Sequence, residues 1–316
     1  MGIAYKDRRY PFFAQRRLIM NNMLGKKSFV ACFVLPALIL FISFSIIPLF
    51  ISGAYSLFQY DGMGKMEFMG LGNYIRLFAE DRHFVKAVLN SYLLVSASLV
   101  IQLPISLFLA MVLARGVKGE KFFRTVYFLP VVISSMVIGQ LWMKMFNSEY
   151  GLLNHLIRAL GASDFNYSWL SNPKTAFLST LIPAVWQYIG YHMLIFYAGI
   201  KSISRDYYEA AQIDGASKWQ VNTKITLPLL ATVIKTCVIF SITGSLRAFD
   251  LIYVMTGGGP NHASEVPATL MYNNLFRRGL YGYGSAQAFF IVVECLLFTF
   301  IVSRLFQKAE EQASAI

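Results

Sequence analysis

The chain has 316 residues, of which 56% are apolar and only 14% charged, whereas a soluble domain carries about a quarter charged residues. This composition excludes an ordinary soluble globular protein and predicts an integral membrane protein. The formal net charge of +12 does not indicate nucleic-acid binding, because the basic residues cluster at the ends of apolar runs, as in proteins oriented across a membrane.

The first 27 residues form a basic segment with seven Lys/Arg and one acidic residue. The apolar run that follows, residues 29–57, is too long for a signal-peptide core and has no small-residue cleavage site after it, so we predict a retained membrane span. Five further apolar runs of spanning length cover residues 90–114, 125–143, 176–200, 229–247 and 285–305. We therefore expect an all-α integral membrane protein with six transmembrane helices. Residues 1–27 are expected to form a cytoplasmic basic segment, residues 28–306 the transmembrane domain, and residues 307–316 a cytoplasmic tail.

The distribution of Lys and Arg predicts the orientation of these spans. With the N-terminus inside, the inner segments hold 17 Lys/Arg and the outer loops hold eight, and three residues at span boundaries are left out of the count. Because cytoplasmic loops carry the excess of positive charge, we expect both termini in the cytoplasm of a multi-pass protein. The polar segment of residues 201–228 then also lies in the cytoplasm.

This polar segment carries helix signals. Ser204 is placed as an N-cap, with Asp206 in the first turn, where a carboxylate suits the helix dipole. Apolar residues recur at helical spacing up to Gly215, which tolerates the left-handed backbone that ends a helix. The segment therefore begins with a short helix and a glycine elbow.

A second short helix is expected directly after the elbow. Ser217 and Gln220, three residues apart, have the form of a capping box. This helix should end before Pro228, because a proline disfavours helix at the preceding residue, Leu227.

The same segment contains a spaced motif. Glu209-Ala210-Ala211 is followed after three residues by Gly215 and after nine more by Ile-Thr-Leu-Pro. The chain thereby resembles permease subunits of binding-protein-dependent ABC importers, in which the EAA loop docks into a cleft of a separate ATPase subunit. The resemblance implies that Glu209 pairs with a basic group of the ATPase, that Gly215 makes the elbow, and that Ala210 and Ala211 allow close approach. The residues it assigns to ATPase coupling are Glu209, Ala210, Ala211, Asp214, Gly215, Ile225, Leu227 and Pro228.

Two other segments resemble the sugar class of these permeases. They are Phe-Met-Gly-Leu-Gly-Asn-Tyr at residues 68–74 and Thr-Gly-Gly-Gly-Pro at residues 256–260. The second is similar to the maltose-F-like half of a permease pair. The resemblance implies one permease subunit of an ATP-driven importer of carbohydrates, in particular oligosaccharides, in the bacterial cytoplasmic (inner) membrane. The implied partners are a second, G-like permease subunit, a homo- or heterodimeric ABC ATPase and an extracytoplasmic solute-binding protein.

The chain is not expected to be an enzyme. It contains no Gly-x4-Gly-Lys-Ser/Thr stretch, so it lacks the usual cradle for ATP phosphates. ATP and Mg²⁺ are expected on the partner ATPase, and we expect no cofactor or metal on this chain.

A sugar path is expected among aromatic and polar side chains inside the spans, because sugars bind to aromatic faces and hydrogen-bonding groups. The fourth span gathers such residues, and Gln187 and Tyr191, four positions apart, share a helix face. Resemblance to maltose-type permeases adds Ser135 in the third span and the small-residue face of Gly244, Ser245 and Ala248 near the fifth span. The predicted path residues are Ser135, Gln187, Tyr188, Tyr191, Gly244, Ser245 and Ala248. The alternative is packing between spans, through aromatic contacts or close approach at small residues.

Ionisable residues inside the membrane are costly and suggest function. Glu294 in the sixth span would serve as a proton site in an ion-coupled secondary sugar carrier, the main alternative function, although the sequence has no inverted repeat to support it. We instead expect Glu294 and Lys235 of the fifth span to pair or to meet through a shared polar contact, since an unpaired charge is costly there. Arg247, if it faces the path, would suit an acidic sugar such as a uronate.

Overall fold

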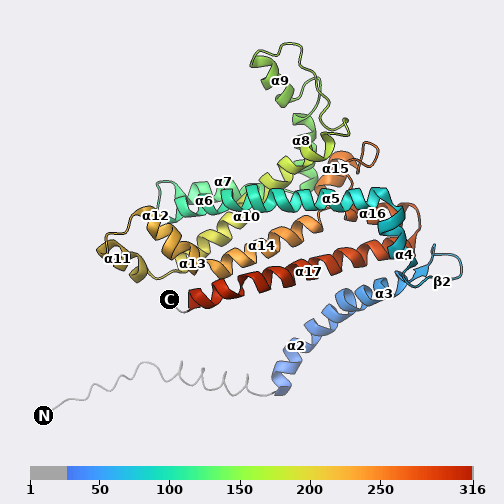
Figure 1. Cartoon of the computed structure of the whole chain (residues 1–316), viewed down its shortest axis with the longest axis horizontal. Coiled ribbons are helices and arrows are strands. Elements are labelled where there is room, and N and C mark those ends of the chain that lie inside the picture. Colours follow the sequence, from blue (N-terminus) through green and yellow to red (C-terminus); the bar gives the residue numbers. More distant parts are fainter. Residues whose placement is uncertain (1–26, 315–316) are drawn as a thin grey trace. The chain divides into compact units, whose positions relative to one another are not determined.

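The computed structural model describes residues 27–314, and the chain divides into two compact units, residues 1–54 and 55–316. Figure 1 traces the helices in chain order. Most of the predicted basic segment, residues 1–26, and the last two residues of the predicted tail lie outside the described residues. The described part of the first unit, with the first residue of the second unit, covers most of the predicted first span. It comprises α2 (Lys27–Phe41), a π-helical segment (Ile42–Ile46) and α3 (Ile47–Tyr55).

The second unit opens with an antiparallel ribbon of two short strands, β1 (Phe58–Gln59) and β2 (Glu67–Phe68), in which Phe58 pairs with Phe68. Helices make up most of the remainder. The α-helices are α4 (Gly72–Ile75), α5 (Arg82–Ala97), α6 (Leu103–Ala114), α7 (Glu120–Val132), α8 (Ser135–Met145), α9 (Leu152–Ala159), α10 (Ala176–Ser202), α11 (Arg205–Ile213), α12 (Lys218–Val221), α13 (Leu227–Leu229), α14 (Ala231–Leu246), α15 (Asp250–Thr256), α16 (Pro267–Tyr272) and α17 (Tyr281–Ser314). Four further π-helical segments lie at Arg76–Glu80, Ser98–Gln102, Asn222–Thr226 and Asn273–Arg277.

Helix α10 lies at the centre of the packing. It contacts α6 and α7 along its length, and α14 packs against α5 and α17. The buried apolar side chains between α6, α10 and α14 include Ala110, Met193, Phe196 and Cys237, each at most 1% exposed. In Figure 1, α11 and α12 lie at one end of α14 and α17, and α16 lies at the other end. The two ends of this bundle therefore carry different loop structures.

The structure confirms an all-α membrane fold, but it does not establish six spans by length and apolarity. Within residues 27–314, four helical stretches meet both requirements: Ala31–Tyr55, Arg82–Ala114, Ala231–Thr256 and Tyr281–Glu311. The predicted third span is a pair of helices, α7 and α8, bent by 95°. Helix α10 has 27 residues, about 40 Å of helix, but polar side chains along it lower its apolarity.

The bend between α7 and α8 has a local cause. Ile133 has an extended backbone (φ −76°, ψ 135°), and the Ser134 hydroxyl accepts a hydrogen bond from the Met136 N–H at 3.3 Å, so Ser134 caps a new helix. A β-branched residue followed by a serine is a weak signal inside an apolar run, which is why the sequence suggests one continuous span.

The expected pair of Lys235 and Glu294 is wrong. The Lys235 ammonium lies 2.6 Å from the carboxylate of Glu310, because α17 continues as a helix to Ser314 instead of ending near residue 305. Glu294 lies sixteen residues before Glu310, about 24 Å along the helix, which is beyond the reach of a lysine side chain. Glu294 is 4% exposed, and its side chain interacts with that of Tyr92 and not with that of Lys235.

Candidate functional site

A cavity of about 490 Å³ lies between the helices of the second unit. Its walls come from α5, the π-helical segment Ser98–Gln102, the start of α8, the middle of α10, the end of α14 and the start of α15. The structure places all seven predicted path residues on these walls: Ser135, Gln187, Tyr188, Tyr191, Gly244, Ser245 and Ala248. Residues that are more than 100 positions apart thus meet around one space.

The polar side chains of the wall form a network across helices. The Gln102 amide nitrogen lies 2.8 Å from Nδ1 of His192, and the Ser98 hydroxyl lies 3.1 Å from the Ser245 hydroxyl. The Gln187 amide donates a longer hydrogen bond, 3.5 Å, to the Ser135 hydroxyl. These contacts fix the orientation of side chains that would otherwise rotate freely in the cavity.

Three buried polar atoms of the cavity wall remain without a partner among the described residues. They are Oε1 of Gln187, Nε2 of His192 and Oγ of Ser241. The side chains are 2%, 3% and 4% exposed, respectively. A buried polar atom without a hydrogen bond costs about 1–3 kcal/mol, so such atoms are normally satisfied by a ligand or by water. The cavity wall therefore carries several hydrogen-bonding side chains, which is the kind of lining that a ligand rich in hydroxyl groups requires.

The rim of the cavity combines aromatic and charged groups. Tyr188 is 43% exposed, and Tyr191 lies with its ring 6.5 Å from that of Phe240. Arg247 and Asp250 are exposed and belong to the same wall. Arg247 is held near the wall by a hydrogen bond of 3.2 Å from its Nε to the Thr243 carbonyl.

Several polar wall residues were not among the seven predicted path residues, and four of them are Ser98, Gln102, His192 and Ser241. His192 and Ser241 adjoin predicted residues, so helical spacing could have added them. Ser98 and Gln102 lie in an apolar run with serines at several other positions, and only the three-dimensional arrangement identifies which of its faces meets α10.

Helices α10 and α7 approach closely beside the cavity. A Cβ atom built on Gly190 would lie 1.8 Å from the carbonyl oxygen of Tyr127 and 2.9 Å from Cα of Phe128. Backbone contacts cannot be relieved by a rotamer change, so a glycine is required at this position. The contact positions the Gln187–Tyr191 turn of α10 relative to α7.

The predicted two-helix segment is present at the end of the bundle that bears α11 and α12 (Figure 1). Ser204 caps α11 by accepting a hydrogen bond from the Asp206 N–H at 3.3 Å. Gly215 has φ +70°, the left-handed conformation expected of the elbow. The Ser217 and Gln220 capping box has both of its hydrogen bonds, at 2.8 and 3.3 Å. The local signals in this segment are confirmed.

The predicted end of the second helix is wrong. The helix continues from α12 through the π-helical segment Asn222–Thr226 into α13, so Leu227 and Pro228 are helical. In the π turn the Leu227 N–H bonds to the Asn222 carbonyl, five residues back. The wider turn accommodates a proline, which cannot donate the hydrogen bond of a regular turn.

The residues assigned to coupling divide between the surface and the interior. Glu209, Ala210, Asp214 and Gly215 are exposed, whereas Ala211 is 6% exposed and packs within the chain. Ile225, Leu227 and Pro228 are partly buried. Two apolar side chains of the same segment are strongly exposed, Ile213 on α11 at 87% and Trp219 on α12 at 75%. The sequence did not single out this apolar pair, which gives the segment the composition of a docking surface.

These features define a class of membrane protein, and comparison with known families agrees. The family model described as "Binding-protein-dependent transport system inner membrane component" matches residues 102–311, and the chain belongs to this family. It is a permease of the ABC importer type, with the fold of such permeases.

Individual relatives place the chain within this class. It is 38% identical to the "Probable ABC transporter permease protein YurN" of Bacillus subtilis over 89% of this chain and 96% of that protein. It is 36% identical to the "Trehalose/maltose transport system permease protein MalF" of Thermococcus litoralis, over 85% of this chain and 90% of that protein. A chain of the crystal structure of a bacterial alginate ABC transporter in complex with its alginate pentasaccharide-bound periplasmic protein shares the fold, with a TM-score of 0.76 at 22% identity over 94% of this chain and 96% of that chain.

Proposed function

We propose that this chain is one of two permease subunits of an ATP-driven importer for oligosaccharides, in which it forms half of the translocation path. A second, G-like permease supplies the other half, a dimeric ABC ATPase drives the cycle, and an extracytoplasmic solute-binding protein delivers the sugar. Both termini face the cytoplasm in this proposal. The relative from Thermococcus litoralis belongs to a trehalose/maltose transport system, which supports a sugar substrate.

One observation carries the proposal. The central cavity is lined by hydrogen-bonding side chains, among them Gln187, His192 and Ser241, and by aromatic rings. A sugar offers hydroxyl groups to the former and a flat face of C–H bonds to the latter. The predicted path residues are thus proposed as sugar contacts.

The two-helix segment is proposed as the coupling element. Its exposed face, with Glu209, Ile213 and Trp219, would enter a cleft of the ATPase, and Glu209 would pair with a basic group there. Closure of the ATPase dimer would then move α10 and α14, which flank the segment in sequence and carry much of the cavity wall. ATP and Mg²⁺ stay on the ATPase.

Transport in proteoliposomes tests the proposal. The chain is reconstituted with its partner permease and ATPase, and uptake of labelled oligosaccharides is measured with the solute-binding protein present. We expect uptake to require ATP and to be blocked by vanadate. Uptake that persists without ATP and collapses with a protonophore would instead support the secondary carrier.

Variants of the cavity wall sharpen this test. Gln187→Ala and Tyr188→Ala should each lower uptake at least tenfold while the ATPase still co-purifies. Gln140→Ala and Tyr150→Ala are matched controls, because both residues are exposed and lie outside the cavity wall. Equal uptake in all four variants would assign the cavity residues to helix packing.

The charge of the substrate is a narrower part of the proposal. Arg247 on the cavity wall would pair with the carboxylate of a uronate-containing oligosaccharide, which guanidinium binds through two parallel hydrogen bonds. Competition of uptake by neutral and by uronate oligosaccharides of equal length tests it. Arg247→Gln should weaken uptake of the acidic sugar only, and an equal loss for the neutral sugar would contradict the assignment.

A further inference from the structure

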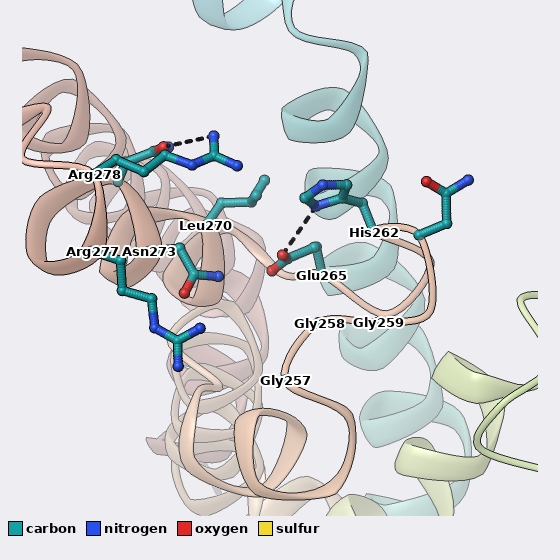
Figure 2. Close-up of a pocket in the computed structure, with 11 residues that line it drawn as sticks. Gly257, Gly258, Gly259, His262, Glu265, Leu270, Asn273, Arg277 and Arg278 are labelled. Atoms are coloured by element: carbon teal, nitrogen blue, oxygen red, sulfur yellow. Dashed lines mark hydrogen bonds and ion pairs between the residues drawn. The ribbon is translucent and has the colours of Figure 1, made fainter.

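A second hollow, of about 390 Å³, lies beyond the far end of α15 from the central cavity. Figure 2 shows its lining, which comes from the glycine-rich turn after α15 and from the end of α16 with its π-helical extension. No described residue lines both this hollow and the central cavity. The hollow is therefore a separate site. It lies at the end of the bundle opposite the two-helix segment, and the distribution of Lys and Arg predicts that this end faces away from the cytoplasm.

The charge that faces the opening of this hollow is positive. Arg277 and Arg278 are both exposed. The one acidic residue of the lining, Glu265, is 2% exposed and is held inward by the Thr269 hydroxyl and by Nδ1 of His262 at 3.2 Å (Figure 2). Each guanidinium has one hydrogen bond within the described part of the unit, Arg277 to the Tyr253 hydroxyl at 2.6 Å and Arg278 to the side-chain Oδ1 of Asn274 at 3.4 Å. A guanidinium has five N–H donors, so most of them can serve a ligand.

The glycine-rich wall is rigidly shaped. Gly257, Gly258, Asn261 and His262 all have positive φ, at 59°, 89°, 49° and 57°. A Cβ atom on Gly258 would lie 2.3 Å from the carboxyl carbon of Glu265, so only glycine fits there. A positive φ is uncommon for the two residues that are not glycine, Asn261 and His262, and such conformations are concentrated at functional sites.

Helix α5 anchors the same wall from outside. The Asn90 amide donates hydrogen bonds to the carbonyls of Ala263 and Glu265, at 3.0 and 2.8 Å. The ring of His83 lies 4.2 Å from the ring of His262. The hollow is thus preorganised, which reduces the entropy lost when a partner group enters.

The surroundings of the hollow have the composition of a protein interface. Phe276, beside the two arginines, is 69% exposed. Arginine and aromatic residues are enriched at protein interfaces and dominate their binding energy. A sugar site, by contrast, would be expected to open into the translocation path, and this hollow shares no wall residue with it.

We propose that this hollow receives an acidic side chain of the solute-binding protein when that protein docks on the permease. The proposal rests on the proposed function, because it takes its partner from there. Arg277 and Arg278 bind the incoming carboxylate through charge-assisted hydrogen bonds, and Phe276 packs against the apolar surface around it.

The docked carboxylate communicates with the central cavity through a short chain of contacts. Arg277 bonds to the Tyr253 hydroxyl, and the Tyr253 ring stacks on Phe249 with centroids 4.9 Å apart. Phe249 lies on the wall of the central cavity. A carboxylate that draws Arg277 away from Tyr253 therefore acts, through the Tyr253 ring, on a residue of the central cavity wall.

The test uses the reconstituted transporter and the solute-binding protein that stimulates its wild-type ATPase activity. The activity is measured against the concentration of that protein at low and at physiological salt. In the double variant Arg277→Glu/Arg278→Glu we expect the half-maximal concentration to rise at least tenfold and to lose its dependence on salt. Arg277→Lys/Arg278→Lys, which keeps the charge, should stay within about threefold of wild type. The control is Lys174→Glu, an exposed cation outside the hollow, which should leave the value unchanged.

The possible results separate this proposal from its alternatives. An unchanged half-maximal concentration in the double Glu variant overturns it. A shift in the concentration of sugar required, at saturating solute-binding protein, also overturns it and assigns the arginines to the substrate. If the double variant does not assemble, Arg278→Gln should still raise the half-maximal concentration about threefold. A wild-type transporter that no solute-binding protein stimulates would refute the proposed function itself.

Discussion

The contact between α10 and α7 at Gly190 predicts a large effect from one added methyl group. In Gly190→Ala the new Cβ would lie 1.8 Å from the Tyr127 carbonyl oxygen, and ordinary contact begins at 3.4 Å, so the helices must separate by about 1.6 Å. Overpacking of this kind costs about 1–3 kcal/mol, and a backbone obstacle places the cost at the upper end. Alanine has a higher helix propensity than glycine, which offsets up to about 1 kcal/mol of this cost. The net loss is about 2 kcal/mol.

Thermal unfolding in detergent measures this loss. At about 2–4 °C per kcal/mol, the apparent Tm of Gly190→Ala should fall by about 4–8 °C. Gly244→Ala is the matched control, because a Cβ there meets nothing within 4 Å and α14 should gain slightly in stability. The reasoning is refuted if Gly190→Ala melts at the wild-type temperature, or if Gly244→Ala falls by a similar amount.

Three further predictions concern other parts of the fold. Glu209→Lys should leave membrane insertion intact but abolish co-purification of the ATPase, and Glu209→Gln should have an intermediate effect. Full retention of the ATPase by the Lys variant would contradict the docking role of Glu209. Lys235→Met and Glu310→Gln should each cost about 1 kcal/mol or less, since the pair is partly exposed, and their double variant should melt no lower than the worse single one. Strictly additive losses would show that the two side chains act independently. Gly258→Ala should lower the apparent Tm more than Gly257→Ala, because both have positive φ but only the former meets a buried carboxyl group; equal Tm values would argue against the rigid wall.

Local signals in the sequence predicted local structure well. The cap at Ser204, the elbow at Gly215 and the capping box of Ser217 and Gln220 depend on residues within one or two turns, so the sequence determines them. The end of that helix was not predictable in the same way, because the π turn before Pro228 has no signature in the local residue types.

Long-range arrangement was predicted only in part. Helical spacing and resemblance led to seven residues that line one cavity. Ser98 and Gln102, which line the same cavity, were missed, because only packing determines which side of the α5–α6 helix is turned toward α10. The partner of Lys235 was predicted wrongly because the depth of each side chain in the membrane was counted along its own span. That count did not include the extension of α17 to Ser314, which brings Glu310 to Lys235. The positively charged hollow depends on residues of a turn and of α16 that no pattern connects.

Three of the π-helical segments contribute to the sites described above. Ser98 and Gln102 belong to the cavity wall, Asn222–Thr226 belongs to the two-helix segment, and Asn273–Arg277 holds one arginine of the hollow. A π turn contains one residue more than an α turn, so everything after it is rotated by about 100° relative to an uninterrupted helix. Loss of a single residue within such a segment would restore a regular helix and turn the following side chains to a different face. In these helices the length of the chain is therefore as strict a requirement as its composition, and homologous permeases should differ here by substitution far more often than by deletion.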